Sequence, residues 1–371
     1  MRWPAALACA ALAAAFLAGC GTPRPPLLSA EPSAPAASAQ PAQPLPETVG
    51  KAGPANWDEL PGWREDDLGS AWPAWMRSCE ALTRRGDWSQ VCAQARRVDP
   101  LDSGALRAYF EAYFQPYRLA NPDGSLTGLI TGYYEPVLRG SRRREGEFQT
   151  PLYRYPAAWR RAKPSPAPTR AELMQGNALA GNELVYVDDP VEAAFLQVQG
   201  SGRVQLNDGT LMRVVFAGSN DLPYQSIGRW LLDQGEITPS HSTMQGIKAW
   251  ARANPGKVER MLAANPRFVF FAESLAGAEL GPPGSLGVPL TPERSIAVDN
   301  GAIPAGAPVF LATTRPLSAQ PLQRLMLAQD TGTAIRGTVR ADFFWGHGAQ
   351  AGELAGRMKQ SGSMWLLLPR R

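Results

Sequence analysis

Histidine and cysteine are scarce in this chain. Its 371 residues include only two histidines, His241 and His347, and four cysteines. Because zinc sites in proteins are usually built from several histidines or from four cysteines, the composition argues against both designs. The chain also has no Walker A loop, and no G-x-G-x-x-G sequence follows an expected strand. Nucleotide chemistry in which a loop cradles phosphates is therefore not expected.

Charge of one sign is not in large excess either. Charged residues make up 19% of the chain, and the formal net charge is +4. So mild a basic balance does not by itself indicate a nucleic-acid partner. Hydrophobic residues make up 44% of the chain, which at this length predicts about two domains with cores of their own.

The chain begins with an apolar run from Ala5 to Ala18. This run is short for a transmembrane helix and has the length of a signal-peptide core. It ends in Leu17-Ala18-Gly19-Cys20, which resembles a bacterial lipobox, in which Cys20 is lipidated and becomes the new N-terminus. Because Gly21 follows and not aspartate, the resemblance points to the outer membrane of a Gram-negative cell. The alternative is an ordinary signal peptide that contains a cysteine.

Residues 21–56 contain no aromatic side chain and are rich in Pro, Ala, Ser and Gln. Such a segment cannot bury enough apolar surface to order itself, so we expect a flexible tether. The mature chain is then exported to an oxidising compartment. Cys79 and Cys92 lie in two expected helices, 71–85 and 88–97. We expect a disulfide between them, the alternative being two buried thiols.

The rest of the chain favours a mainly β fold with accessory helices. Asp102 or Ser103 can cap a helix whose apolar positions extend to Tyr117. Residues 139–146 are basic and are expected to be irregular. The close spacing of Gly and Pro between short strands favours a small barrel over a parallel sheet with crossover helices. Expected strands are 126–134, 184–187, 194–198, 203–206, 211–217, 268–271, 295–298, 309–313, 325–329 and 364–368, and expected helices are 226–234, 243–253 and 258–264.

Two aspartates near the C-terminus could carry chemistry. Asp330 precedes Thr331-Gly332, and Asp342 precedes Phe343-Phe344-Trp345. Glycines allow turns that bring the two acids together, and an apolar neighbourhood raises a carboxyl pKa so that a proton is held near neutral pH. That is the property of a general acid for glycosidic cleavage. The alternative is that both aspartates are turn and capping residues.

Eight segments in order resemble the membrane-bound lytic murein transglycosylase A family, whose C-terminal domain is named for three aspartates. They are residues 131–136 (TGYYEP), 146–153 (GEFQTPLY), 198–202 (VQGSG), 224–228 (YQSIG), 244–247 (MQGI), 265–271 (NPRFVFF) and the two aspartate segments. The resemblance implies a double-psi β-barrel built from residues 57–140 and 267–371. It also implies a smaller inserted β domain at 141–266, with a groove between the two that holds the glycan.

The resemblance also implies a reaction. The family cleaves the bond between N-acetylmuramic acid and N-acetylglucosamine without water. Asp342 matches the catalytic aspartate, which protonates the glycosidic oxygen and then, as a base, takes the proton of the C6 hydroxyl while a 1,6-anhydro ring closes. Asp330 matches a second motif aspartate with a supporting hydrogen-bond role. The expected partners are peptidoglycan strands, the outer membrane through Cys20 and cell-wall synthesis complexes, with no cofactor and no metal.

Further groove residues are implied by the same motifs. The implied substrate-binding residues are Thr131, Tyr133, Tyr134, Gln199, Gly200, Ser201 and Gly202. The alternative for the two tyrosines is a position in the barrel core. For Trp345, a core position is the preferred interpretation. Glu135 is not expected to be essential, and the alternative to a functional role is a solvated loop end.

Two other functions remain open from the sequence. One is a muramidase, in which Asp342 is the acid and Asp330 or Glu135 activates water. The other is a peptidoglycan-binding lipoprotein without activity, in which Asp342 would be dispensable.

Overall fold

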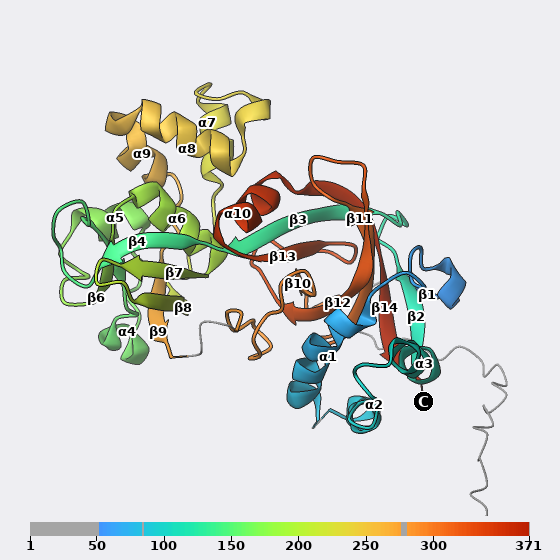
Figure 1. Ribbon diagram of the computed structural model, residues 1–371. Coiled ribbons are helices and arrows are strands. Elements are labelled where there is room, and N and C mark those ends of the chain that lie inside the picture. Colours follow the sequence, from blue (N-terminus) through green and yellow to red (C-terminus); the bar gives the residue numbers. More distant parts are fainter. Residues whose placement is uncertain (1–51, 84, 276–279, 371) are drawn as a thin grey trace, which may run out of the picture. The chain divides into compact units, whose positions relative to one another are not determined.

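The computed structural model describes residues 52–83, 85–275 and 280–370 (Figure 1). The expected signal peptide, the lipidated Cys20 and most of the expected tether lie outside these residues. The last residues assigned to the tether include a short strand, β1 (Ala52–Pro54), which pairs antiparallel with β2. Within the described part of the chain, no helix is both long enough and apolar enough to cross a membrane.

The described residues form a mainly β structure with two sheets, as expected. The first sheet has eight strands in the order β1-β2-β14-β11-β12-β10-β13-β3. Because β14 also pairs with β3, six of these strands close into a ring, in which the β10–β12 and β13–β3 pairs are parallel. The strands are β2 (Phe114–Leu119), β3 (Gly128–Glu135), β10 (Ser295–Val298), β11 (Pro308–Thr314), β12 (Pro321–Asp330), β13 (Ala341–His347) and β14 (Lys359–Pro369).

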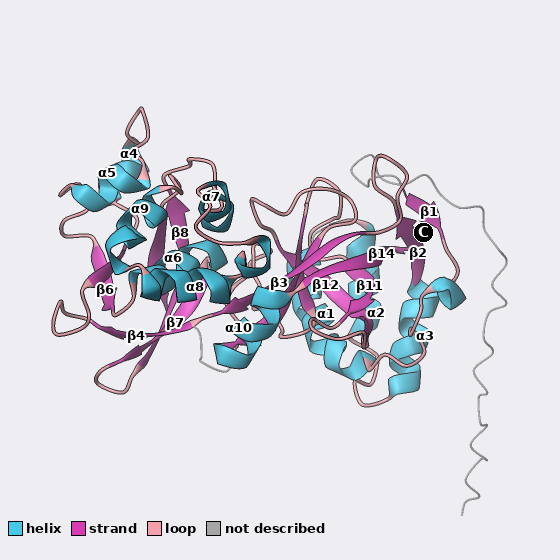
Figure 2. Ribbon diagram, turned by 90° about the horizontal axis from the view of Figure 1, so that it is seen from above, coloured by secondary structure: helices cyan, strands magenta, loops and turns pink. Residues whose placement is uncertain are grey.

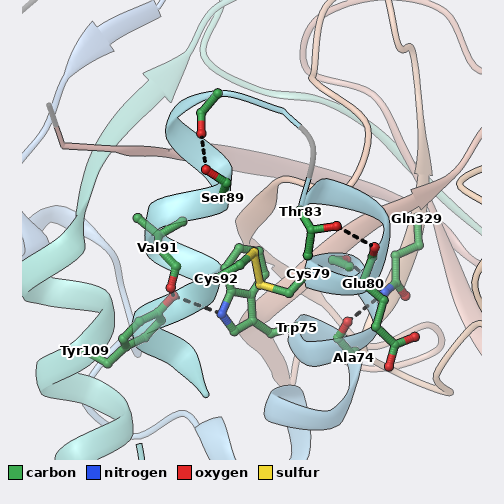
Figure 3. Close-up of a disulfide and its surroundings, with 12 residues drawn as sticks. Ala74, Trp75, Cys79, Glu80, Thr83, Ser89, Val91, Cys92, Tyr109 and Gln329 are labelled. Carbon is green, nitrogen blue, oxygen red and sulfur yellow. Dashed lines mark hydrogen bonds between the residues drawn. A yellow bond between two sulfur atoms is a disulfide. The ribbon is translucent and has the colours of Figure 1, made fainter. Parts of the chain in front are cut away.

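Three helices pack against the first sheet and carry an aromatic core: α1 (Leu68–Leu82), α2 (Asp87–Ala95) and α3 (Ser103–Tyr113). The expected disulfide between Cys79 and Cys92 is confirmed and joins α1 to α2 (Figure 3). On the other side of α1, the side-chain amide of Gln329 donates to the Ala74 carbonyl and to the Ser78 hydroxyl. These bonds fix the end of β12, directly before Asp330, to a helix that the disulfide holds.

The second sheet has six strands, all of which lie between β3 and β10 in the sequence. Only Pro136 separates β3 from β4, so the chain passes directly from one sheet to the other, as Figures 1 and 2 show. The strands in spatial order are β5 (Thr150–Tyr153), β6 (Glu183–Val187), β4 (Val137–Ser141), β7 (Ser201–Leu206), β8 (Leu211–Ser219) and β9 (Val269–Ser274). The helices are α4 (Ala157–Arg161), α5 (Arg170–Gln175), α6 (Pro190–Gln199), α7 (Ile227–Asp233), α8 (Met244–Ala253) and α9 (Val258–Ala263).

Several expectations from the sequence are wrong in detail. The strand expected at 194–198 is the second half of α6, because Asp189 caps the first turn and Pro190 is preorganised for it. Tyr117, expected on a helix, lies in β2, and β4 occupies the start of the segment 139–146. Neither β13 nor the helix that follows it, α10 (Gly348–Arg357), was expected from the sequence.

Candidate active site

The sheet register places Asp330 and Asp342 on either side of one residue. Asp330 is the last residue of β12 and Asp342 is the second residue of β13. Ala297 of β10, the strand between them, pairs with both. Directly opposed residues in neighbouring strands project from the same face of a sheet, so both carboxyl groups lie on the same face as the methyl group of Ala297.

A short chain of hydrogen bonds reaches Asp342 from β3. Thr131 is the partner of Asp342 in the parallel pair of β3 and β13. The Oγ1 hydroxyl of Thr131 donates to Oδ1 of Asp342 at 2.6 Å, and Nη2 of Arg340 donates to the same Oγ1 at 2.9 Å. Because the hydroxyl accepts from a cation while it donates, its bond to Asp342 is polarised.

The environment of Asp342 suits an acid that works near neutral pH. The side chain is half-buried, and its pKa is raised to about 6, chiefly by burial and to a lesser degree by the nearby charge of Asp330. The hydrogen bond from Thr131 and the charge of Arg340 lower the pKa and limit the rise. A carboxyl group with a pKa near 6 is protonated in a substantial fraction of molecules close to neutrality and can both give and take a proton.

Asp330 is more fully hydrogen-bonded. The hydroxyl of Tyr133 donates to Oδ2 at 3.0 Å, and the backbone N–H groups of Ser285 and Thr331 both donate to Oδ1 at 2.9 Å. Burial raises the pKa of Asp330, and these donors oppose the rise because they favour the carboxylate. Three donors therefore hold Asp330 in place, whereas the hydrogen bond that Asp342 accepts comes from Thr131.

Tyr133 belongs to this pair of acids. Its ring packs against Phe344, with ring centroids 5.2 Å apart. Burial raises the pKa of its phenol well above the usual range, and the charges of Asp330 and Asp342 raise it further. Tyr133 is therefore a fixed neutral donor. Four of the residues expected from the sequence, Thr131, Tyr133, Asp330 and Asp342, lie together.

The glycine between Thr131 and Tyr133 has a packing reason. A Cβ on Gly132 would lie 2.7 Å from Nε1 of Trp345 and 2.9 Å from Cα of Ala355. The side chain of Trp345 is buried at 5% exposure, as expected for a core residue. The absence of a side chain at Gly132 therefore lets β3 approach β13 and α10 closely, which brings Thr131 against Asp342.

The remaining expected groove residues lie elsewhere. Tyr134 is buried, and its backbone N–H donates to Oε1 of Gln199 at 3.1 Å. Gly200 ends α6 with a left-handed φ of 82°, and Gly202 of β7 packs against Pro136. In the structure, Tyr134 and residues 199–202 are not among the residues that line the cavity at Asp342.

A cavity of about 140 Å³ opens beside Asp342. Residues 332–335, which follow Asp330, form one wall, and side chains from the second-sheet part of the chain form the other. The residues on that second wall are Arg170, Gln197, Val198, Tyr224, Asn265, Arg267 and Val269. None of them was proposed from the sequence as a site residue. The segments that carry the resemblance include Val198, Tyr224, Asn265, Arg267 and Val269, but nothing in the sequence marked Arg170 or Gln197.

Asp299, directly after β10, was also missed. Its carboxylate accepts hydrogen bonds from the N–H groups of Gly301 at 3.0 Å and Gly337 at 2.9 Å, and it lies 3.6 Å from a guanidinium nitrogen of Arg336. The hydrogen bond from Gly337 is the largest cause of the lowered pKa of Asp299. Asp299 therefore fixes the end of the loop that contains residues 332–335 and forms one wall of the cavity. The signal that could have found Asp299 is the resemblance to a domain named for three aspartates, of which only Asp330 and Asp342 were singled out.

The alternative interpretation of Glu135, a solvated loop end, is wrong. Its side chain is 0% exposed and accepts hydrogen bonds from Nε of Arg203 at 2.8 Å and from Nε of Arg213 at 2.9 Å. A charge buried at the junction of β3 and β4 needs such partners. Because both carboxylate oxygens are bound to cations, Glu135 is not placed to activate water.

No metal site is evident in the described part of the chain. Across residues 52–83, 85–275 and 280–370, no three His, Cys, Asp or Glu side chains are grouped so that they could hold an ion.

Comparison with known proteins gives matches over most of the described chain. The family model described as "MltA specific insert domain" matches residues 129–272, and the "3D domain" model matches residues 294–368. Membrane-bound lytic murein transglycosylase A of Escherichia coli K12 is 35% identical over 246 residues, which is 64% of this chain and 65% of that protein, just under two thirds of its length. The protein of the same name from Vibrio cholerae is 34% identical over 276 residues, 72% of each chain.

Solved structures agree with these matches. The lytic transglycosylase LtgG of Burkholderia pseudomallei is 57% identical, with a TM-score of 0.62 over 87% of this chain and 96% of that one. MltA from Neisseria gonorrhoeae is 36% identical, with a TM-score of 0.76 over 86% and 95%. MltA of E. coli with bound chitohexaose is 29% identical, with a TM-score of 0.69 over 82% and 91%. The two domain matches and the identity to the V. cholerae protein show that this chain belongs to the membrane-bound lytic murein transglycosylase A family.

Proposed function

We propose that this protein is a peptidoglycan lytic transglycosylase in which Asp342 is the acid and then the base. The observation that carries the proposal is the position of Asp342, a half-buried carboxyl with a pKa of about 6 beside a cavity. The names of the relatives and the chitohexaose bound to the E. coli protein support a glycan substrate.

The proposed reaction needs one carboxyl group in two protonation states. Protonated Asp342 gives its proton to the glycosidic oxygen while the bond from C1 of the muramoyl sugar to that oxygen breaks. The carboxylate then takes the proton of the C6 hydroxyl of the same sugar as the C6 oxygen bonds to C1. The proton is returned, no water is consumed, and the product carries a 1,6-anhydro ring.

The neighbours of Asp342 support this cycle. The Thr131 hydroxyl holds one carboxyl oxygen at 2.6 Å and stabilises the carboxylate that forms when the proton leaves. Asp330, fixed by Tyr133 and two backbone donors, adds negative charge, which favours the protonated form of Asp342 and stabilises positive charge that develops at C1.

A muramidase is less well supported. It requires a second carboxylate that is free to activate water or to attack C1 of the sugar. Glu135 is bound by two arginines, and Asp330 accepts three hydrogen bonds. A wall-binding protein without activity has no use for an acid with a raised pKa.

Analysis of the products tests the proposal. Residues 21–371 are expressed without the lipid anchor, incubated with purified sacculi, and the products are weighed. Muropeptides lighter than the reducing forms by one water, absent with Asp342→Asn, are expected. Products that incorporate solvent oxygen would establish a hydrolase, and retained binding of sacculi without products would establish a wall-binding protein.

We also propose a double-psi β-barrel built from residues 57–140 and 267–371, with the β domain at 141–266 inserted. The second-sheet strands β4 and β9 extend a few residues beyond these bounds, so the inserted domain is slightly longer at both ends. A closed ring of six strands that contains two parallel pairs supports this topology. The passage from β3 to β4 through Pro136 supports an insertion near residue 140. A crystal structure of the mature chain tests both the barrel topology and the domain boundaries.

A lipid anchor on Cys20 in the outer membrane completes the proposal. Its support is the lipobox-like sequence and the name "membrane-bound" that the relatives carry. Cells grown with radiolabelled palmitate are expected to label the wild-type chain but not the Cys20→Ser variant. Fractionation should recover only the wild type with outer membranes, and an unlabelled wild type would contradict the anchor.

A further inference from the structure

Two arginines line the cavity at Asp342, and neither forms an ion pair among the residues that the structure describes. They are Arg170, the first residue of α5, and Arg267, just before β9. Apart from Asp342 itself, every other residue that lines the cavity is uncharged. Because the cavity lining contains two arginines and one carboxyl group, it has an excess of positive charge.

Arg170 is a buried cation without an acid partner. It is 3% exposed. Its Nε donates to the Asn265 carbonyl at 3.1 Å, and its Nη2 donates to the Gln197 side chain at 2.6 Å and to the Arg267 carbonyl at 2.7 Å. All these acceptors are neutral, and burial lowers its pKa to about 10. A buried charge is normally paired, so an anion in the cavity would supply what the protein does not.

Arg267 is the more accessible of the two. It is half-buried, and its side chain donates a hydrogen bond from Nη1 to the Leu222 carbonyl at 3.2 Å. The acid whose titration it influences is Asp221, which already forms an ion pair with Lys163. A guanidinium group offers five N–H donors in a planar fork that matches a carboxylate, so Arg267 has donors to spare.

We propose that Arg267, supported by the charge of Arg170, forms a subsite for a carboxylate carried by the muramoyl sugar of the glycan. The inference rests on the proposed function. The sugar rings of peptidoglycan are neutral, and the carboxylates belong to the lactyl group of the muramoyl sugar or to the peptide attached there. That group is on C3 of the same ring whose C1 must face Asp342, so a cation in the same small cavity lies where the carboxylate arrives.

This subsite acts on binding and not on the acid. The charges that shift the pKa of Asp342 are those of Arg340 and Asp330, and neither Arg170 nor Arg267 is among them. Removal of the charge at Arg267 should therefore raise KM for glycans that carry carboxylates and leave the pH profile of kcat in place. A general structural defect would instead weaken the binding of carboxylate-bearing and neutral glycans alike, and it would change both KM and kcat.

The test compares Arg267→Gln with Arg161→Gln on three ligands. Arg161 is an exposed arginine of α4 outside the cavity lining, so its variant is a matched charge control. The ligands are peptide-bearing glycan, amidase-stripped glycan with free lactyl carboxylates, and a neutral chitooligosaccharide. Thermal unfolding confirms that both variants fold.

For Arg267→Gln we expect KM for a carboxylate-bearing glycan to rise about tenfold, because one charge-assisted contact is lost. The dissociation constant for the chitooligosaccharide should be unchanged. A loss confined to stripped glycan identifies the lactyl carboxylate, and a loss confined to peptide-bearing glycan identifies the peptide. Equal losses on the neutral ligand, or no loss on either glycan, would overturn the subsite.

The same ligands separate this inference from the proposed function. Their dissociation constants are also measured in the Asp342→Asn background, where no turnover is needed. If the wild type releases no products, the proposed function fails, yet a weaker binding of carboxylate-bearing glycan by the Arg267→Gln, Asp342→Asn double variant would still support the subsite.

Discussion

The hydroxyl of Thr131 lies 2.6 Å from Oδ1 of Asp342, although 211 residues separate the two in the sequence. The parallel pairing of β3 with β13 creates this contact, and it joins the first strand of the ring to the proposed acid. The bond lowers the pKa of Asp342, whereas burial raises it. The value of about 6 therefore reflects two opposed effects that substitutions can separate.

Replacement of Thr131 by valine removes the hydrogen bond and keeps the shape of the side chain. Because the lost bond stabilised the carboxylate, the pKa of Asp342 should rise, by about one unit if the bond contributes about 1.5 kcal/mol. The alkaline limb of the kcat/KM profile should shift to higher pH by the same amount. We also expect kcat at the optimum to fall about tenfold, since the carboxyl is no longer oriented.

The control for this experiment is Thr131→Ser, which keeps the hydroxyl. Its alkaline limb should coincide with that of the wild type. If the valine variant also keeps the wild-type limb, Thr131 does not set the pKa of the catalytic acid.

Asp342→Asn should stabilise the protein above pH 6. A carboxyl whose pKa is raised in the folded state, here to about 6 from the usual 3.8, is ionised more easily in the unfolded chain. Its contribution to stability is therefore complete below about pH 4 and is lost as the pH rises to 6. The neutral amide has no such loss, so the variant should exceed the wild type by about 3 kcal/mol at pH 7.5 and by under about 1 kcal/mol at pH 4.

Urea unfolding at the two pH values measures this difference. Glu147→Gln, which neutralises an exposed carboxylate, serves as the control and should show no comparable dependence. A variant less stable than the wild type at pH 7.5 would show that Asp342 stabilises the fold as an anion.

Much of the fold could be predicted because its signals are local. The helices expected at 226–234, 243–253 and 258–264 correspond to α7, α8 and α9. The strands expected at 203–206 and 211–217 correspond to β7 and β8, and the Asn207-Asp208-Gly209 sequence between them is typical of a hairpin turn. The α6 segment was assigned wrongly because a short apolar run fits a strand or a helix equally well. There the decisive signal, the Asp189 cap, lies outside the run itself.

The site could be predicted only where a motif pointed to it. Asp342, Asp330, Thr131 and Tyr133 lie together as the motif match implied, because strand pairing holds them. The arginines of the cavity wall could not be found in the same way, since their role depends on a packing between distant segments. Nothing within the sequence around Arg170 shows that it is buried or that no acid faces it.

The disulfide should contribute to stability and not to catalysis. The bond closes a loop between residues 13 apart, for which the chain-entropy relation gives about 3 kcal/mol. The Cys79→Ala, Cys92→Ala double variant should unfold about 2–3 kcal/mol more easily and keep its kcat at 25 °C. Reductant should lower the unfolding temperature of the wild type only. A wild type insensitive to reductant under denaturing conditions would contradict this expectation.

Glu135→Gln should be among the most damaging single substitutions outside the cavity. The change leaves the guanidinium groups of Arg203 and Arg213 buried without their shared anion. Loss of one partner from a buried ion pair costs about 3–5 kcal/mol, whereas an exposed pair contributes under about 1 kcal/mol. Urea unfolding of Glu135→Gln beside Glu147→Gln, whose exposed carboxylate pairs with Arg139, measures the contrast. Because β3 carries both Thr131 and Glu135, this substitution should also reduce kcat, and equal stabilities for the two variants would mean that the buried cluster does not hold the junction of β3 and β4.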